Sequence, residues 1–176
     1  MQVWKFGGTS VGKPERMKSI RQLITEDGKA KIVVLSALSG STNTLLSISE
    51  SLVNKNTAEA KAKTAELRAH YDQFLTELYQ TPAGLGKGQA IVEKEFNFIQ
   101  QLIDTPNYGA KQEKEIVALG ELLSTQIFEA FLQEEGVNSV LLPALDFMVI
   151  DADNEPVFAK IEENIAKVLK ANAGKE

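Results

Sequence analysis

The residues best suited to chemistry lie in a glycine turn near the start of the chain, where Lys5 precedes Gly7, Gly8, Thr9 and Ser10. Two adjacent glycines allow backbone amides to approach an anion closely, and the lysine adds a positive charge beside them. The spacing differs from a Walker A loop, whose lysine follows the glycines, and from a GxGxxG turn. The pattern fits an anion site, or a tight bend beside a lysine that extends into water.

A second turn, at residues 36–43, is rich in hydroxyl groups and contains Ser36 and Thr42. Such a turn can bind a small polar substrate, but it has no ionisable group for acid–base chemistry. The alternative is an ordinary loop in which Ser41 or Thr42 caps the following helix. Taken alone, the pattern favours the ordinary loop.

Glu121 is the third candidate, because it follows Gly120 within a largely apolar stretch. A carboxylate there could receive a substrate ammonium, and the glycine would leave room for its approach. However, Glu121, Thr125 and Glu129 repeat every four residues, which is typical of a solvated helix stripe. The periodicity by itself favours the stripe.

The elements around the first two candidates predict an α/β fold. Apolar runs at 3–6 and 32–35 indicate buried strands, and helical spacing predicts helices at about 14–27 and 42–53. The order strand, turn, helix, repeated twice, is typical of parallel βαβ units. Ligands of such sheets bind at the carboxyl ends of the strands, where both turns lie.

The rest of the chain is mainly helical by its pattern. Amphipathic spacing predicts helices at about 67–78, 92–103, 111–134 and 159–169, with a glycine-rich break at 84–88 and a strand at 140–142. No strand follows the last helix, although a βαβ crossover should deliver one. We therefore expect the chain to be part of a larger domain.

Composition narrows the class of protein. The chain has 176 residues, 43% of them hydrophobic, which suits one globular unit. It has no cysteine, which excludes disulfides and thiolate chemistry, and we predict no metal ligands among its side chains. A net charge of −5 argues against nucleic-acid binding. Neither a membrane span nor a secretory signal is evident, so we expect a cytoplasmic protein without membrane attachment.

Four sequence blocks together resemble the signatures of aspartate kinases. They are KFGGTSVG at 5–12, VVLSALSGSTN at 33–43, LGELLST at 119–125 and LPALDF at 142–147. The similarity runs from residue 1 to about residue 160, and all four blocks occur in order. Each block alone is a weak signal, but their combination is specific.

The resemblance implies an amino-acid kinase fold, a three-layer αβα sandwich with a mainly parallel sheet, here truncated. It implies transfer of the ATP γ-phosphoryl group to the β-carboxylate of L-aspartate, which gives 4-phospho-L-aspartate. This is the first step of lysine, threonine and methionine biosynthesis. Mg²⁺ would accompany ATP, and the full-length protein would form a homo-oligomer.

The resemblance also assigns roles to the candidate residues. Lys5 would stabilise charge on the transferring phosphoryl group, and a set of neighbouring residues would line the phosphate path (Gly7, Gly8, Thr9 and Ser10). Ser36 and Thr42 would contact aspartate or the phosphoryl group, while Glu121 would bind the aspartate ammonium. Phosphoryl transfer needs positioning and charge stabilisation, which such groups can supply.

The chain departs from the family pattern in what it lacks. The later glycine-rich block with the catalytic aspartate, the substrate-binding arginine, the adenine pocket and the regulatory ACT domains have no counterpart. We therefore interpret residues 1–176 as the N-terminal, substrate-side portion of a catalytic domain and expect it to be inactive alone. A bifunctional aspartate kinase–homoserine dehydrogenase and a non-catalytic small-molecule-binding or assembly domain remain alternatives.

Overall fold

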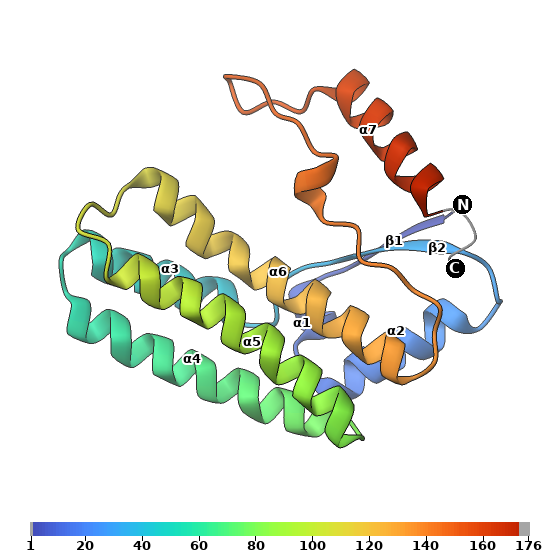
Figure 1. The fold of residues 1–176 in the computed structure, drawn as a ribbon, viewed down its shortest axis with the longest axis horizontal. Coiled ribbons are helices and arrows are strands. Elements are labelled where there is room, and N and C mark those ends of the chain that lie inside the picture. The colour runs from blue at the N-terminus through green and yellow to red at the C-terminus, as the bar shows by residue number, and fades with distance from the viewer. Residues whose placement is uncertain (1, 173–176) are drawn as a thin grey trace.

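The computed structural model of the chain describes residues 2–172 (Figure 1). Its elements in chain order are β1 (Gln2–Phe6), α1 (Gly8–Val11), α2 (Pro14–Thr25), β2 (Lys31–Leu35), α3 (Ser41–Val53), α4 (Thr57–Leu78), α5 (Pro82–Ile103), α6 (Ala110–Glu134), the 3-10 turn η1 (Ala144–Asp146) and α7 (Phe158–Ala171). The predicted strands at 3–6 and 32–35 are confirmed. The helices predicted at 42–53 and 111–134 are also confirmed, to within one residue at each end.

The two strands pair in parallel, joined by α2, as the βαβ pattern predicts. Their register places Phe6 opposite Leu35, the last residue of each strand. The Ser36 amide then donates to the Phe6 carbonyl at 3.0 Å, which continues the ladder by one step. Both predicted turns therefore start side by side at one edge of the sheet.

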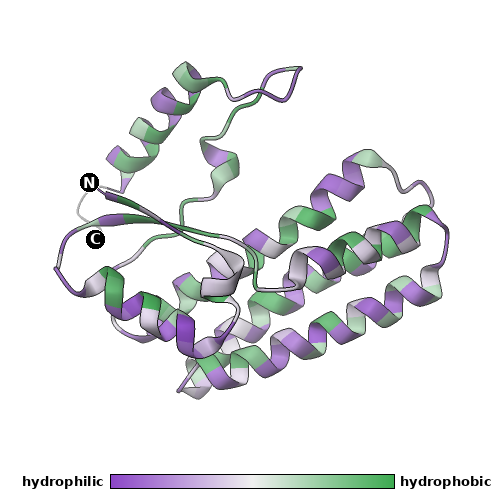
Figure 2. Ribbon diagram, turned by 180° about the vertical axis from the view of Figure 1, so that it is seen from behind, coloured by the Kyte–Doolittle hydropathy of each residue, from purple (hydrophilic) through white to green (hydrophobic). Residues whose placement is uncertain are grey.

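Helices α3 to α6 form a bundle in which long helices run side by side (Figure 1). Apolar and polar residues alternate along each helix (Figure 2). The apolar ones recur every three or four residues, and many of their side chains are buried. Fully buried members of this core are Leu45, Ile48, Tyr71, Leu75, Val92, Ile99, Ile116, Leu123 and Ile127. Burying an aliphatic side chain of this size contributes about 1.5–3 kcal/mol. Because α6 contacts both α3 and β2, it connects the bundle to the sheet.

The predicted break at residues 84–88 is wrong, because these residues form the first turns of α5. Pro82 occupies the first turn of α5, and the Thr81 hydroxyl caps it by accepting a hydrogen bond from the Gly84 amide at 3.0 Å. A Cβ on Gly84 would collide with the carboxylate of Glu134, and one on Gly88 would collide with the ring of Tyr79. These glycines therefore permit close helix packing.

The strand predicted at 140–142 is also absent, because within residues 2–172 no strand lies beside this segment. The sheet of the described part has two strands, so the expected three-layer sandwich is not seen there. A third strand would need a neighbour for its backbone groups. Helix α7 stands away from the bundle, and none of its residues is buried (Figure 1). No helix between residues 2 and 172 is both long and apolar enough to cross a bilayer.

Candidate functional site

The first turn follows β1 and leads directly into the short helix α1. The Ser10 and Val11 amides donate to the Gly7 carbonyl at 2.8 and 3.2 Å. The amides of Gly8 and Thr9 precede these bonds and have no backbone acceptor within residues 2–172. Two N–H donors at this turn are thus free for water or a ligand.

Positive charge gathers over this turn. Lys5 is exposed, and its Nζ lies 3.7 Å from where a Cβ on Gly7 would be, so the glycine leaves open the space next to the ammonium. The guanidinium of Arg16 donates to the carbonyl of Thr9. The sequence reasoning missed Arg16. The signal for it was a basic residue in the first turn of the helix that follows the glycine turn.

The second turn packs tightly onto the first. A Cβ on Gly8 would lie 3.1 Å from the carbonyl oxygen of Ala37, and one on Gly12 would lie 2.6 Å from the Cβ of Ser39. The second distance is too short for two carbon atoms, so a side chain at Gly12 would push the turns apart. These glycines therefore allow the two strand-end turns to touch.

Helix α6 reaches the same place through its third sequence block. Oε1 of Glu121 accepts a hydrogen bond from the Ala37 amide at 3.2 Å. A Cβ on Gly120 would lie 2.7 Å from the Cβ of Ala37 and 3.8 Å from Oγ1 of Thr42. The expectation that Gly120 leaves room for a substrate is wrong, because Ala37 fills that space. Glu121 is exposed, but its contact with the second turn makes it more than part of a solvated stripe.

The hydroxyl groups of the second turn have different surroundings. Gly40 precedes α3 with a φ of 86°, so neither Ser41 nor Thr42 is the N-cap that the alternative interpretation required. Ser41 is buried and accepts a hydrogen bond from the Tyr71 hydroxyl at 3.1 Å. The side chains of Ser36 and Thr42 are partly exposed and make no hydrogen bond to another described residue.

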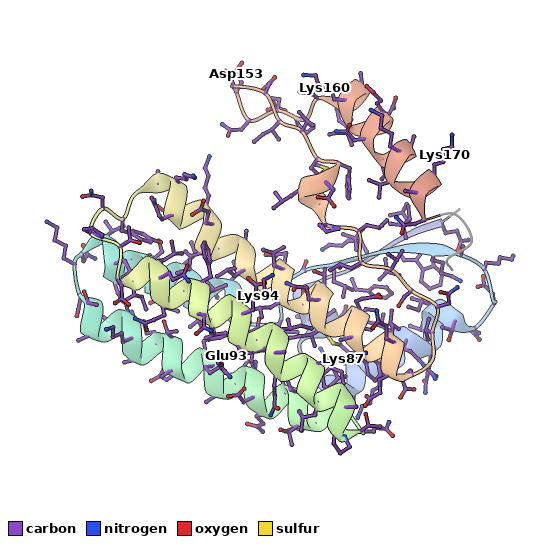
Figure 3. The ribbon with its side chains drawn as sticks, in the orientation of Figure 1. Lys87, Glu93, Lys94, Asp153, Lys160 and Lys170 are labelled. Carbon is purple, nitrogen blue, oxygen red and sulfur yellow. The ribbon has the colours of Figure 1, made fainter. Side chains whose placement is uncertain are left out.

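All eight predicted site residues belong to these three segments, which meet at Ala37. The first turn contacts Ala37 at its carbonyl oxygen, and Glu121 accepts from the Ala37 amide. Ser36 and Thr42 belong to the same turn as Ala37, and Oγ1 of Thr42 lies 3.8 Å from where a Cβ on Gly120 would be. Two shallow surface hollows lie elsewhere: one is lined by residues of α2, the other by residues of α4 and α5 that include Glu93, labelled on the bundle in Figure 3. Neither includes a predicted site residue.

Residues 1–174 match the model of the amino acid kinase family. The chain belongs to this family. Among its relatives, aspartokinase 2 of Arabidopsis thaliana is 29% identical over 99% of this chain and 32% of that protein. Aspartokinase 1 of the same plant is 32% identical over 86% of this chain and 27% of that protein. The resemblance predicted from the four sequence blocks is thereby confirmed.

Solved structures agree with this family assignment. Aspartokinase III of E. coli in complex with aspartate and ADP superimposes with a TM-score of 0.85 at 26% identity. The match covers 98% of this chain and 38% of that one, in its N-terminal part. This amino acid kinase chain therefore spans about a third of the length of these three relatives.

Proposed function

We propose that this chain is the N-terminal, substrate-side portion of an aspartate kinase, which transfers the γ-phosphoryl group of ATP to the β-carboxylate of L-aspartate. The observation that carries the proposal is the hydrogen bond between Glu121 and the Ala37 amide. It joins the third block to the second, whose backbone packs on the first at Gly8. Three segments distant in sequence thus border one place.

On the phosphate side, the donors of the first turn suit an anion. Lys5 offers a mobile positive charge, and its ammonium lies beside the open space at Gly7. Backbone N–H groups at Gly8 and Thr9, with the hydroxyl groups of Thr9 and Ser10, add donors along the phosphate path. Charge that develops on the transferring phosphoryl group is stabilised by donors already in position.

Mg²⁺ fits this arrangement as a companion of ATP. Across residues 2–172, no three acidic or histidine side chains gather into a metal site. Magnesium in phosphoryl-transfer enzymes is held largely by phosphate oxygens and water, with one or two carboxylates. Its role when bound is to neutralise phosphate charge. The residues of this chain orient the phosphates and the acceptor.

On the amino-acid side, Glu121 offers its carboxylate to the ammonium of L-aspartate. Its second oxygen is not engaged by the Ala37 amide, so one carboxylate can hold both the second turn and the substrate. The second turn contacts both Glu121 and the first turn, so its Ser36 and Thr42 hydroxyl groups would contact the β-carboxylate or the γ-phosphate. The proposal includes a homo-oligomeric, cytoplasmic full-length enzyme at the first step of lysine, threonine and methionine biosynthesis.

Substitution of Glu121 by glutamine tests the proposal in the complete product of the reading frame that encodes this chain. The amide oxygen of the introduced side chain can still accept from Ala37, but the negative charge is lost. We expect the KM for L-aspartate to rise about tenfold or more, because one hydrogen bond between charged groups is lost. The KM for ATP should stay unchanged. An ADP-release assay measures both.

Thr125→Val is the matched control, because Thr125 lies one turn further along α6 and its hydroxyl donates only to backbone carbonyls. This variant should keep the wild-type KM for aspartate. Equal losses for both substrates in Glu121→Gln would assign the carboxylate a structural role. Absence of aspartate-dependent ADP release in the wild type would overturn the proposed function itself.

A further inference from the structure

Tyr71 of α4 is a fully buried phenol directed at the second turn. Its side chain has no exposed surface, and its hydroxyl donates to Oγ of Ser41 at 3.1 Å. Ser41 is itself 1% exposed and is the first residue of α3. The bond therefore joins two buried polar groups, one on α3 and one on α4, that are 30 residues apart in sequence.

The surroundings of Tyr71 leave its ring little freedom. The ring of Phe96 meets it edge to face at a centroid distance of 5.9 Å, and that of His70 does so at 6.0 Å. Burial raises the pKa of Tyr71 to about 12. The hydrogen bond to Ser41 acts in the opposite direction, and the negative charge of Glu121 also raises this pKa. The phenol thus remains a proton donor near neutral pH.

Ser41 lies next to the proposed site, so a small displacement of Ser41 would also move Thr42. The first turn of α3 has no side-chain cap, since its N-cap is Gly40 in the left-handed conformation. The backbone of Ser41 is held by its amide, which donates to the Leu38 carbonyl at 3.0 Å. Its side chain is held by the hydrogen bond from Tyr71. Thr42 follows directly, and its Oγ1 lies near the position of a Gly120 Cβ, at 3.8 Å.

We propose that Tyr71 is a positioning residue that holds the first turn of α3 through Ser41, and so fixes the spacing between the Thr42 hydroxyl and Glu121. Tyr71 does not touch the substrate, because its side chain has no exposed surface. The inference rests on the proposed function only for the identity of the ligand, L-aspartate. The ordering of the turn is a property of the chain itself.

Tyr71→Phe tests the inference, because it keeps the ring and removes the hydroxyl. The chain offers a matched control in Tyr108→Phe, since the Tyr108 hydroxyl donates to Oγ of Ser49 at 2.8 Å, two turns further along α3. Amide hydrogen exchange should speed up about fivefold in Tyr71→Phe at Ser41 and Thr44, whose amides donate to the Leu38 and Gly40 carbonyls. This is the typical contribution of one hydrogen bond. Tyr108→Phe should leave these amides unchanged.

Kinetics on the complete product of the reading frame supply the second measurement. Tyr71→Phe should raise the KM for L-aspartate about fivefold and leave the KM for ATP unchanged, whereas Tyr108→Phe should change neither. Ser41→Ala removes the same bond from the other side and should give the same result. The double variant should then be no worse than either single one.

The outcomes distinguish the positioning role of Tyr71 from the proposed function of the protein. If exchange at the Ser41 and Thr44 amides is equal in Tyr71→Phe, Tyr108→Phe and wild type, the positioning role is overturned whatever the substrate. Additive losses in the double variant would overturn the route through Ser41. A wild-type protein that neither binds nor phosphorylates aspartate would overturn the proposed function, while the exchange result would still decide the role of Tyr71.

Discussion

Lys5 and Arg16 place two positive charges beside a glycine turn on a chain whose net charge is −5. The local charge at this turn is therefore positive although the net charge of the chain is negative, as an anion site on an acidic protein requires. The two cations differ in freedom. Arg16 donates to the carbonyl of Thr9, whereas Lys5 has no ion-pair partner among residues 2–172. In the function we propose, Lys5 is therefore free to follow the phosphoryl group as charge develops on it.

Replacing Lys5 by methionine removes that charge and keeps most of the side-chain volume. We expect kcat to fall about 100-fold, the typical loss for one donor that acts mainly on the transition state, with a much smaller change in the KM for L-aspartate. Steady-state kinetics of the complete reading-frame product measure both constants. Lys13→Met is the control, because Lys13 is also exposed and lies between α1 and α2. Similar losses in the two variants would contradict the role of Lys5.

The residues that sequence reasoning could find are those whose types signal their chemistry locally. Lys5, the two glycines and Glu121 stand out by composition or motif. Tyr71 and Ala37 do not, because their roles depend on partners 30 and 84 positions away. A core tyrosine and a small turn residue have no local feature that identifies such partners.

At the scale of elements, glycines at helix contacts decide how closely segments approach. A Cβ added to Gly120 of α6 would lie 2.7 Å from the Cβ of Ala37, and neither Cβ could move by a side-chain rotation. Gly86 of α5 is exposed, with no atom near its missing Cβ. The same substitution at the two positions should therefore have opposite effects.

Gly86→Ala should stabilise the protein by about 0.5–1 kcal/mol, because alanine restricts the unfolded chain and favours the helix. Gly120→Ala should destabilise it by about 1–3 kcal/mol, the usual cost of overpacking, and should weaken aspartate binding by displacing Ala37. Urea unfolding gives the free energies, and calorimetric titration gives the affinity. Equal signs for the two variants would refute the steric argument.

Glu134, at the end of α6, binds the loop between α4 and α5 through hydrogen bonds. Its carboxylate accepts hydrogen bonds from the Gln80 and Thr81 amides at 3.2 and 2.8 Å and from the Thr81 hydroxyl. Burial alone would raise the pKa of Glu134, but these hydrogen bonds outweigh it and hold the pKa below its ordinary value of 4.5. A lowered carboxylate pKa stabilises the folded state at every pH above the unfolded value.

Glu134→Gln should therefore lower the free energy of unfolding by about 1–2 kcal/mol at neutral pH, since the acceptor loses its charge and only one of its two oxygens remains. The difference from wild type should shrink as the pH falls below 4.5 and through the lower folded pKa, where Glu134 becomes protonated. Urea midpoints across this range measure it. Glu129→Gln is the control on the same helix, and a difference that persists unchanged in acid would contradict the assigned cause.

The bounds of a helix could be predicted from the sequence where a single hydrophobic pattern runs through the whole helix. Helix α6 is apolar over most of its circumference, and its bounds agree with the predicted 111–134 to within one residue. The error at 84–88 has a physical cause, because glycines that break isolated helices are tolerated where a ring and a carboxylate pack against them. That packing involves Glu134, about 50 residues away.

At the scale of the whole molecule, the parallel pairing and the family were predictable, but the extent of the sheet was not. A strand is defined by its neighbours, and the apolar run at 140–142 has none in the described part of the chain. Large apolar side chains stay exposed on the strands and in the last third of the chain: Val3, Val34, Leu145, Met148, Ile150 and Phe158. The two strands and α7 therefore carry apolar surface that residues 2–172 leave uncovered.

The last prediction concerns the 176-residue chain compared with the complete product of its reading frame. The chain supplies the first-turn cations and the Glu121 carboxylate, but it spans about a third of its relatives' length. We therefore expect no aspartate-dependent ADP release from the 176-residue chain alone in a coupled assay with Mg-ATP, and turnover from the complete product. Glu121→Gln in the complete product distinguishes this turnover from background ATPase activity. Turnover by the 176-residue chain at the rate of the complete product would mean that the segments meeting at Ala37 suffice for the whole reaction.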